Sequence, residues 1–237
     1  MTNSDWQPGP DHDTLIARSQ LYQKLRQFFA ERNVMEVDVP VLASSAGTDP
    51  HIELIPAQAC QQQVYLQTSP EFFMKRLLAN GSGDIYSLGK AFRNEESGPR
   101  HNPEFTMLEW YRLGLDDQQL INEALELIQH ACGSLDVHRF SYRELFESEL
   151  GINPHSSDSS TLQTLAKRHI ELDWQDDDRD VWLDLLMTHI IEPQLPQGLC
   201  AIYDYPHTQA ALARIGNNAR GDRVARRFEI YLDGIEL

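Results

Sequence analysis

The sequence predicts an α+β fold in which an antiparallel sheet is flanked by helices. Apolar residues recur at helical spacing over about residues 14–33, which indicates an amphipathic helix. Two strand-like runs, 85–92 and 105–112, are separated by a polar loop and therefore predict a long antiparallel hairpin. The remaining elements are helical patterns over 117–132, 142–150, 161–169 and 181–191, followed by strand patterns over 200–205 and 228–237.

Length and composition limit the architecture and the partners. The chain has 237 residues, of which 41% are hydrophobic and 24% are charged, so one compact domain over residues 1–237 is expected. Its formal net charge of -16 repels phosphate backbones, which disfavours a nucleic-acid partner. The acidity also suits a role in solubility alone, so this argument has little weight by itself.

Cysteine use and hydropathy indicate a reducing, cytoplasmic setting. Cys60, Cys132 and Cys200 are far apart and lack the spacing of a disulfide framework or a zinc site. The first ten residues are polar and resemble neither a signal peptide nor a transit peptide. No apolar run approaches the roughly 20 residues that span a bilayer, so no membrane association is expected.

The first helix is expected to begin at Asp13 or Thr14, which are both good N-cap residues. Its apolar stripe consists of Leu21, Leu25, Phe28 and Phe29. Alternating valines at positions 37, 39 and 41 surround Pro40 and predict an edge strand, because proline has no donor for a central ladder. That edge is expected to face another subunit.

The next segments predict a strand followed by a helix. Residues 64–68 (VYLQT) form the strand, and a Ser69-Pro70 turn leads into a helix over 71–79. The helix is expected to turn Phe72, Leu77 and Leu78 inward. Residues 134–198 contain several helical patterns joined by polar and acidic connections, which indicates a helical insertion within the same domain.

The loop of the predicted hairpin is rich in groups that bind nucleotides. Arg93 and Arg100 offer planar guanidinium groups that donate two hydrogen bonds to a phosphate. Phe105 offers a ring on which a purine stacks, and Glu95 offers an acceptor for an exocyclic amine. The same residues also suit a surface hairpin held by salt bridges, so the pattern alone leaves both readings open.

Longer stretches of the sequence resemble a known family. The segments FRNE (92–95) and RHNPEFTMLEWY (100–111) resemble motif 2 of class II aminoacyl-tRNA synthetases, at about residues 92–112, and are most similar to the lysine branch. FFAERNVMEVDVPVL resembles motif 1, at about residues 21–42. TSPEFFMKRLL (68–78) resembles the amino-acid-binding segment, and FEIYLDGIEL (228–237) resembles the strand before motif 3. The resemblance implies a class II synthetase catalytic domain.

This resemblance implies the residues of an ATP site. Arg93 would be the catalytic residue, holding the α-phosphate and neutralising charge as the substrate carboxylate attacks it. Glu236 would bind the magnesium ion that accompanies ATP. The full set implied for ATP is Arg93, Asn94, Glu95, Arg100, His101, Asn102, Phe105, Glu236 and Leu237.

The resemblance also implies a site for a lysine isomer. Glu71 would pair with the substrate's backbone-type amine, while Glu109 and Tyr111 would receive the side-chain ammonium. Two carboxylates suit a substrate with two amines, because burying an ammonium without such partners is costly. Ser69 and Pro70 complete this set.

The acceptor follows from a narrower resemblance. Lysyl-tRNA synthetases carry an anticodon-reading OB-fold before motif 1, and the motif 1 helix begins here near residue 14, so no tRNA partner is expected. Such a core, together with DYPHTQAALARI (204–215), resembles the EpmA (PoxA/GenX) family. That family attaches (R)-β-lysine to a lysine of translation elongation factor P. A homodimer formed through motif 1 is also expected.

Other readings remain open at this point. The chain could be a catalytic core fragment of a lysyl-tRNA synthetase, an aspartate–ammonia ligase, or a non-catalytic paralogue that acts as a binding or regulatory subunit. No motif 3 segment occurs before Leu237, so the domain is expected to be incomplete at its C-terminus. The chain as given is therefore expected to bind ATP poorly, to form no adenylate and to aggregate through an open sheet edge.

Overall fold

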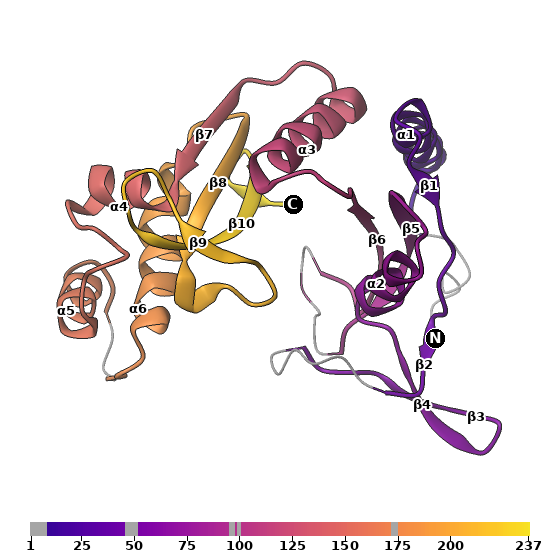
Figure 1. The fold of residues 1–237 in the computed structure, drawn as a ribbon, viewed down its shortest axis with the longest axis horizontal. Helices are drawn as coiled ribbons and strands as arrows, with labels where there is room; N and C mark the ends of the chain where they lie inside the picture. The colour runs from indigo at the N-terminus through magenta and orange to yellow at the C-terminus, as the bar shows by residue number, and fades with distance from the viewer. Residues whose placement is uncertain (1–8, 46–51, 95–97, 99–100, 172–174) are drawn as a thin grey trace. The chain divides into compact units, whose positions relative to one another are not determined.

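The computed structural model describes residues 9–45, 52–94, 98, 101–171 and 175–237. These residues divide into two compact units, Met1–Leu115 and Asp116–Leu237. Each unit has strands, helices and buried apolar side chains of its own (Figure 1). No helix in the part of the chain that is described is long and apolar enough to cross a bilayer.

The first unit begins with helix α1, His12–Glu31. Its N-cap is Asp11, whose carboxylate accepts a hydrogen bond from the amide of Thr14 at 2.8 Å, so the predicted caps Asp13 and Thr14 were too late in the chain. The helix ends before Asn33, which adopts a φ of 55°.

The main sheet of this unit has the order β1–β5–β6, with bounds Met35–Glu36, Ile85–Phe92 and Glu104–Tyr111. Strands β5 and β6 pair antiparallel from Ile85 opposite Tyr111 to Phe92 opposite Glu104, which confirms the predicted hairpin. Strand β1 pairs with β5 in parallel, so this sheet combines the predicted antiparallel hairpin with one parallel edge strand. The valines at 37, 39 and 41 lie outside any strand, because β1 ends at Glu36.

The two faces of this sheet pack against different helices. On one face, Phe29 of α1 stacks on Tyr86 with ring centroids 4.3 Å apart. On the other face, Met74 of α2, Glu71–Ala79, packs with Ile85 and Val39. Met74 is fully buried, whereas Phe72 is exposed, so the inward orientation predicted for Phe72 was wrong.

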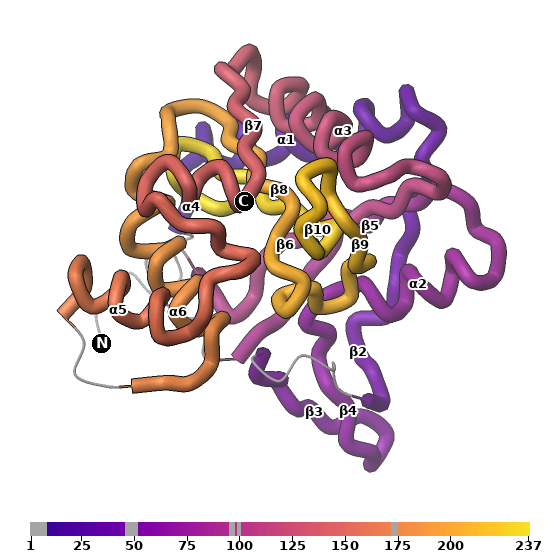
Figure 2. The backbone as a smooth tube through the Cα atoms, turned by 60° about the vertical axis from the view of Figure 1, so that its left-hand side comes forward, coloured from indigo at the N-terminus to yellow at the C-terminus, as the bar shows by residue number. Residues whose placement is uncertain are grey.

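A small second sheet completes the first unit. It has the order β2–β4–β3, with bounds Leu42–Ala43, Gln62–Leu66 and Pro56–Ala59. Strands β3 and β4 form the hairpin that runs away from α2 in Figures 1 and 2. Its two-residue turn, Cys60-Gln61, has positive φ at both positions.

The second unit is built on a sheet of order β11–β10–β8–β7, with β9 paired to β10. The bounds are β7 Val137–Ser141, β8 Leu199–Pro206, β9 Ile215–Asn217, β10 Arg223–Leu232 and β11 Ile235–Glu236. Strand β7 is parallel to β8, and the other pairs are antiparallel. The sequence had predicted two strands here, 200–205 and 228–237, and the structure divides the second between β10 and β11, whereas the short strands β7 and β9 were not predicted.

Helices cover this second sheet. They are α3 Asp117–Cys132, α4 Tyr142–Leu150, α5 Ser159–His169 and α6 Arg179–Leu186, after which the chain continues as a π-helix over Met187–Ile191. The core between sheet and helices includes Phe146, Trp182, Ile202 and Tyr231. Each of α3 and α4 begins with a capping box, at Asp116 and Ser141 respectively, which explains why both were predicted with the correct bounds.

Candidate functional site

On the face of the β5–β6 hairpin that is directed towards α2, small side chains of β5 lie beside acidic and aromatic side chains of β6. Beyond Ile85, strand β5 contributes three small residues to this face, Ser87, Gly89 and Ala91, of which Ser87 pairs with Glu109 and Ala91 with Phe105. A methyl group placed on Gly89 would come no closer than 3.8 Å to the nearest side chain. Small residues at these three positions leave room for a bound molecule above the hairpin.

Glu109 is the most perturbed acid on this face. Burial and, after it, the neighbouring charge of Glu71 raise its pKa to about 7, although hydrogen bonds with the hydroxyl groups of Ser69 and Tyr111 act in the opposite direction. Burial and the same two carboxylates also raise the pKa of Tyr111, which therefore stays a neutral donor. The structure thus brings four of the predicted substrate residues into one site.

Glu71 differs from Glu109 because it already has a cationic partner. Its carboxylate accepts from the ammonium of Lys75, one helical turn later, at 2.6 Å. Pro70 occupies the N-cap position of α2 and is buried, and the amide of Glu71 donates to the hydroxyl of Ser69 at 3.2 Å. This turn brings Ser69 and Glu71 near Glu109. Their role in substrate binding stays a prediction.

Arg93 lies at the end of β5, beside the aromatic ring that was predicted to hold adenine. Its guanidinium lies 5.2 Å from the centroid of Phe105, and its Nε donates to the carbonyl of Thr68 at 3.5 Å. The backbone amide of Arg93 donates to the carbonyl of Pro103 at 3.0 Å, which holds the base of the hairpin loop. A cation and a ring face therefore adjoin at this end of the hairpin.

The remaining predicted ATP residues of the hairpin are less defined. The side-chain amide of Asn94 donates to Glu53 at 3.0 Å. His101 and Asn102 are exposed. Glu95 and Arg100 lie outside the described residues.

A cavity of ≈ 480 Å³ borders this group of residues. Its lining includes Thr68, Ser69 and Lys75, which contact Arg93, Glu109 and Glu71 respectively. Glu109 and Arg93 themselves do not line it, so the cavity adjoins the predicted substrate residues without containing all of them.

The predicted magnesium ligand belongs to the second unit. Glu236 lies on β11 and lines a cavity of ≈ 340 Å³ together with Glu192, Glu229 and Tyr231. Burial raises the pKa of Glu236, and the charges of Glu229 and Glu192 raise it further. Leu237 is exposed, and its amide donates to the carbonyl of Ile230 at 2.9 Å.

Glu229 was not singled out from the sequence. It lies two residues before Tyr231, which pairs directly with Glu236, so the alternation along β10 places Glu229 and Glu236 on one face of the sheet. Alternation read along 228–237 as a single strand would put Glu229 on the opposite face from Glu236, and only the turn between β10 and β11 brings the two to one face. No three metal-binding side chains among the described residues lie close enough together to form a complete site.

Two kinds of comparison relate the chain to known proteins. The family of class II tRNA synthetases (D, K and N) matches residues 9–237. A protein of Vibrio cholerae named elongation factor P–(R)-β-lysine ligase is 46% identical over 100% of this chain and 75% of its own length. Proteins of the same name from Haemophilus influenzae and Mannheimia succiniciproducens are 42% and 41% identical, each over 98% of this chain and 73% of their length.

These matches extend through the hairpin, the SPE segment and the last strands, which are the places where the site residues lie. The identity also exceeds 40% in each of the three relatives. The chain belongs to the elongation factor P–(R)-β-lysine ligase family, within the class II tRNA synthetases.

Proposed function

We propose that the chain activates (R)-β-lysine, or lysine, with ATP and transfers the aminoacyl group to a lysine side chain of elongation factor P. The names of its relatives support this amino acid and this acceptor. The observation that carries the proposal is the pair of carboxylates, Glu71 and Glu109, which lie close enough for one to raise the pKa of the other. A reducing cytoplasm is the setting we propose for the reaction, since all three cysteines are free thiols.

Substrate recognition would rest on charge. The raised pKa of Glu109 reports negative charge that the protein alone leaves poorly neutralised, and an ammonium group would neutralise it. Glu71 would receive the second amine, in exchange for part of its contact with Lys75. Ser69 and Tyr111 would orient Glu109 through their hydroxyl groups.

ATP would be held along the hairpin. Phe105 would stack on adenine, and Arg93 would contact the α-phosphate, since the two side chains already adjoin. Asn94, Glu95, Arg100, His101 and Asn102 would hold the rest of the nucleotide. Glu229 and Glu236 would hold magnesium, since the two carboxylates line one cavity and a hard cation prefers carboxylate oxygen, and a bound magnesium ion supplies charge neutralisation to phosphates.

The proposed reaction has two steps. First, the substrate carboxylate attacks the α-phosphorus of ATP and pyrophosphate leaves, while Arg93 neutralises the charge that accumulates on the phosphoryl oxygens. The acceptor's lysine amine then attacks the carbonyl carbon, the bond to the phosphate oxygen breaks, and AMP leaves as the amine loses its proton. Glu71 and Glu109 would hold the aminoacyl group in place through both steps.

A homodimer through motif 1 is part of the proposal. Helix α1 exposes Leu15, Ile16 and Leu21, and the segment that follows it exposes Met35 and Leu42. Large apolar side chains that recur on one continuous segment suit a contact with a second copy. Pro40, near the centre of that segment, is exposed in the single chain.

Pyrophosphate exchange with a panel of amino acids tests the proposal. We expect exchange that depends on lysine isomers, and mass spectrometry of elongation factor P should show one added lysyl group. The measurement uses this chain and a chimera that carries the remaining C-terminal part of the Vibrio cholerae relative, since the match spans 75% of that protein. Exchange by the chimera with aspartate, or with no amino acid at all, would refute the proposed substrate.

A further inference from the structure

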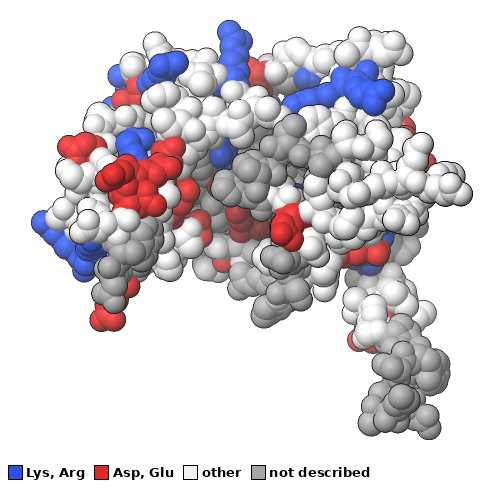
Figure 3. All heavy atoms as spheres, turned by 90° about the horizontal axis from the view of Figure 1, so that it is seen from below, with Lys and Arg blue, Asp and Glu red and all other residues white. Residues whose placement is uncertain are grey.

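The segment around strands β9 and β10 is strongly basic in an acidic protein. Residues 214–227 contain five arginines and a single acid, Asp222, whereas the chain as a whole has a net charge of -16. On the face drawn in Figure 3, Lys and Arg lie next to Asp and Glu in several places. The local excess of positive charge in this segment is unexpected unless the arginines have specific contacts.

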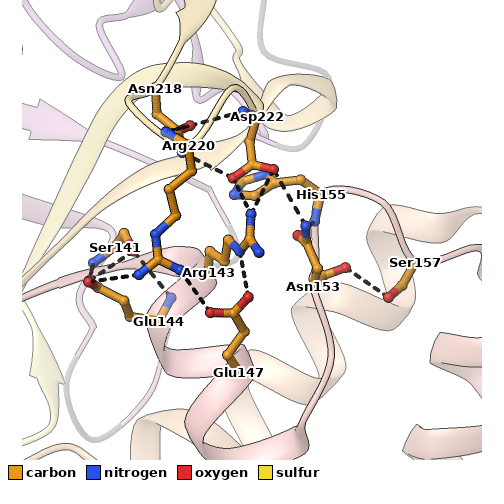
Figure 4. A network of polar contacts seen from close by, with 10 residues as sticks. All are labelled: Ser141, Arg143, Glu144, Glu147, Asn153, His155, Ser157, Asn218, Arg220 and Asp222. Atoms are coloured by element: carbon orange, nitrogen blue, oxygen red, sulfur yellow. Dashed lines mark hydrogen bonds and ion pairs between the residues drawn. The ribbon is translucent and has the colours of Figure 1, made fainter.

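Arg220 of this segment, together with Arg143 of helix α4, holds the β9–β10 turn in place. Arg143 of α4 contacts Asp222 in the turn at 3.0 and 3.1 Å, and its Nε donates to Glu147 at 2.6 Å (Figure 4). Arg220, also in the turn, donates to the other carboxylate oxygen of Glu147 at 2.9 Å. The carboxylate of Asp222 also accepts from the side-chain amide of Asn218 at 3.2 Å. The turn is therefore joined to helix α4 at two points.

We call these contacts between the β9–β10 turn and helix α4 the anchor. Within the anchor, the carboxylate of Asp222 has both cationic and neutral hydrogen-bond donors. Burial alone would raise the pKa of Asp222, but hydrogen bonds from Arg143, Asn218 and Asn153 outweigh this effect and hold the pKa below its usual value. The side chain of Asn218 accepts from the amides of Arg220 and Asp222, which closes the turn on itself. A turn restrained in this way keeps the side chains beside it in defined positions.

Arg226 and Gly216 complete the restraint on the hairpin. The guanidinium of Arg226 donates to the carbonyl of Asn217 at 2.8 Å and lies 3.4 Å from Asp204. It crosses the backbone at Gly216, where an added methyl group would come within 3.4 Å of its Nε. Glycine at this position therefore lets the arginine lie across β9.

Four exposed side chains lie close to these contacts in the chain. Arg214 and Arg223 are exposed, and neither side chain has a hydrogen bond or ion pair within the described residues. Leu212 and Ile215 are large apolar side chains that are also exposed, Leu212 to 65%. The register pairs Arg223 with Asn217 and Ala225 with Ile215, so Ile215 and Arg223 share one face of the hairpin. We call these four residues the hairpin patch.

We infer that the hairpin patch docks an acidic surface of the protein acceptor. This inference rests on the proposed function, because it assigns a place for the acceptor of that reaction. Arginine is enriched at the centres of protein–protein interfaces, and exposed apolar side chains beside it favour burial against a partner. Guanidinium groups pair best with carboxylates, so the complementary surface would be acidic.

A nucleic acid fits the patch less well. Interfaces with nucleic acids are polar and strongly basic, and affinity grows with the number of phosphates that are neutralised. Only Arg214 and Arg223 are available in the patch, on a chain of net charge -16, and Leu212 and Ile215 would face solvent or phosphate. The restrained turn also reduces the ordering cost of binding a folded protein surface.

Binding of labelled elongation factor P to the purified chain, followed by fluorescence anisotropy at low and high salt, tests the inference. The double variant Arg214→Gln/Arg223→Gln should raise Kd about tenfold at low salt and flatten its salt dependence. Leu212→Ser should raise Kd without changing the salt dependence. The control is Arg168→Gln, which removes the same charge from an exposed arginine of α5 and should leave Kd unchanged.

The outcomes separate docking from chemistry. The inference would be overturned by an unchanged Kd in the double variant, or by a wild-type chain that does not bind elongation factor P. It would also be overturned if the wild-type chain bound RNA, and the double variant lost RNA binding but still bound elongation factor P with the wild-type Kd. Lysine-dependent pyrophosphate exchange needs no acceptor, so it should be equal in the wild-type and double-variant chimeras. Exchange that fails with every lysine isomer, while binding still depends on both arginines, would reject the proposed chemistry and keep the docking surface.

Discussion

Replacing Glu109 with glutamine should stabilise the protein at alkaline pH and change its stability little in acid. Burial, followed by the charge of Glu71, raises the pKa of Glu109 from 4.5 to about 7. A raised folded-state pKa contributes stability that is fully present below the unfolded-state pKa and is lost as the pH rises through the folded-state pKa. The loss therefore occurs between about pH 4.5 and pH 7. Glutamine can still accept hydrogen bonds from Ser69 and Tyr111, but it never ionises.

The separation between the two pKa values determines the size of the effect. Ionisation of Glu109 in the folded protein lowers the unfolding free energy by roughly 3 kcal/mol at about pH 8 and by less than about 1 kcal/mol at about pH 5. Solvent around the exposed part of the side chain screens some of this cost. The gain in unfolding free energy on Glu109→Gln should therefore be about 2 kcal/mol larger at the higher pH.

Urea unfolding at the two pH values, followed by tryptophan fluorescence, measures the difference between variant and wild type. Other titrating groups are common to both proteins and cancel in that difference. The matched control is Glu104→Gln, an exposed acid that pairs with Lys90 on the opposite face of the same strand. Its effect should stay within about 0.5 kcal/mol at both pH values, as for other exposed pairs.

The result that would refute this reasoning is a Glu109→Gln effect of equal size at both pH values. The variant should also bind lysine more weakly than wild type, because it has lost one of two carboxylates. Calorimetry at about pH 7 in buffers of different ionisation enthalpy should show proton release when lysine binds to the wild type and none in the variant.

Three further predictions concern other parts of the molecule. Arg93→Ala should lower adenylate formation in the chimera by on the order of 10²-fold and leave unfolding by urea nearly unchanged, and near wild-type exchange would remove Arg93 from the catalytic set. Asp222→Ala should lower the unfolding free energy by about 2 kcal/mol at neutral pH by removing one of the two carboxylates that Arg143 contacts and the acceptor for Asn218. Because the pKa of Asp222 is depressed, that difference should disappear as the pH falls below about 4. A difference independent of pH would contradict the claim that ionised Asp222 stabilises the β9–β10 turn. Leu42→Lys should shift the mass measured by light scattering from dimer to monomer, and a monomeric wild type would reject the proposed dimer.

Local chemistry explains which elements were predictable. The bounds of α3 and α4 follow from capping boxes within four consecutive residues, and the bounds of α2 follow from the turn at Pro70. Strands β7 and β9 were missed because short polar strands acquire their pairing from partners far away in the sequence. The exposure of Phe72 was missed for the same reason, since the helix alone does not show which face meets the sheet.

The sequence by itself determined the family, the hairpin and which side chains share a face of that hairpin. The alternation along β6 places Glu109 and Tyr111 on one face whatever surrounds them. Only the tertiary structure decided that α2 brings Glu71 close enough to raise the pKa of Glu109, because that effect depends on burial and distance. The contact of Arg143 with Asp222, 79 residues apart in the chain, likewise exists only in the folded protein, since no local pattern encodes which charges meet across such a separation.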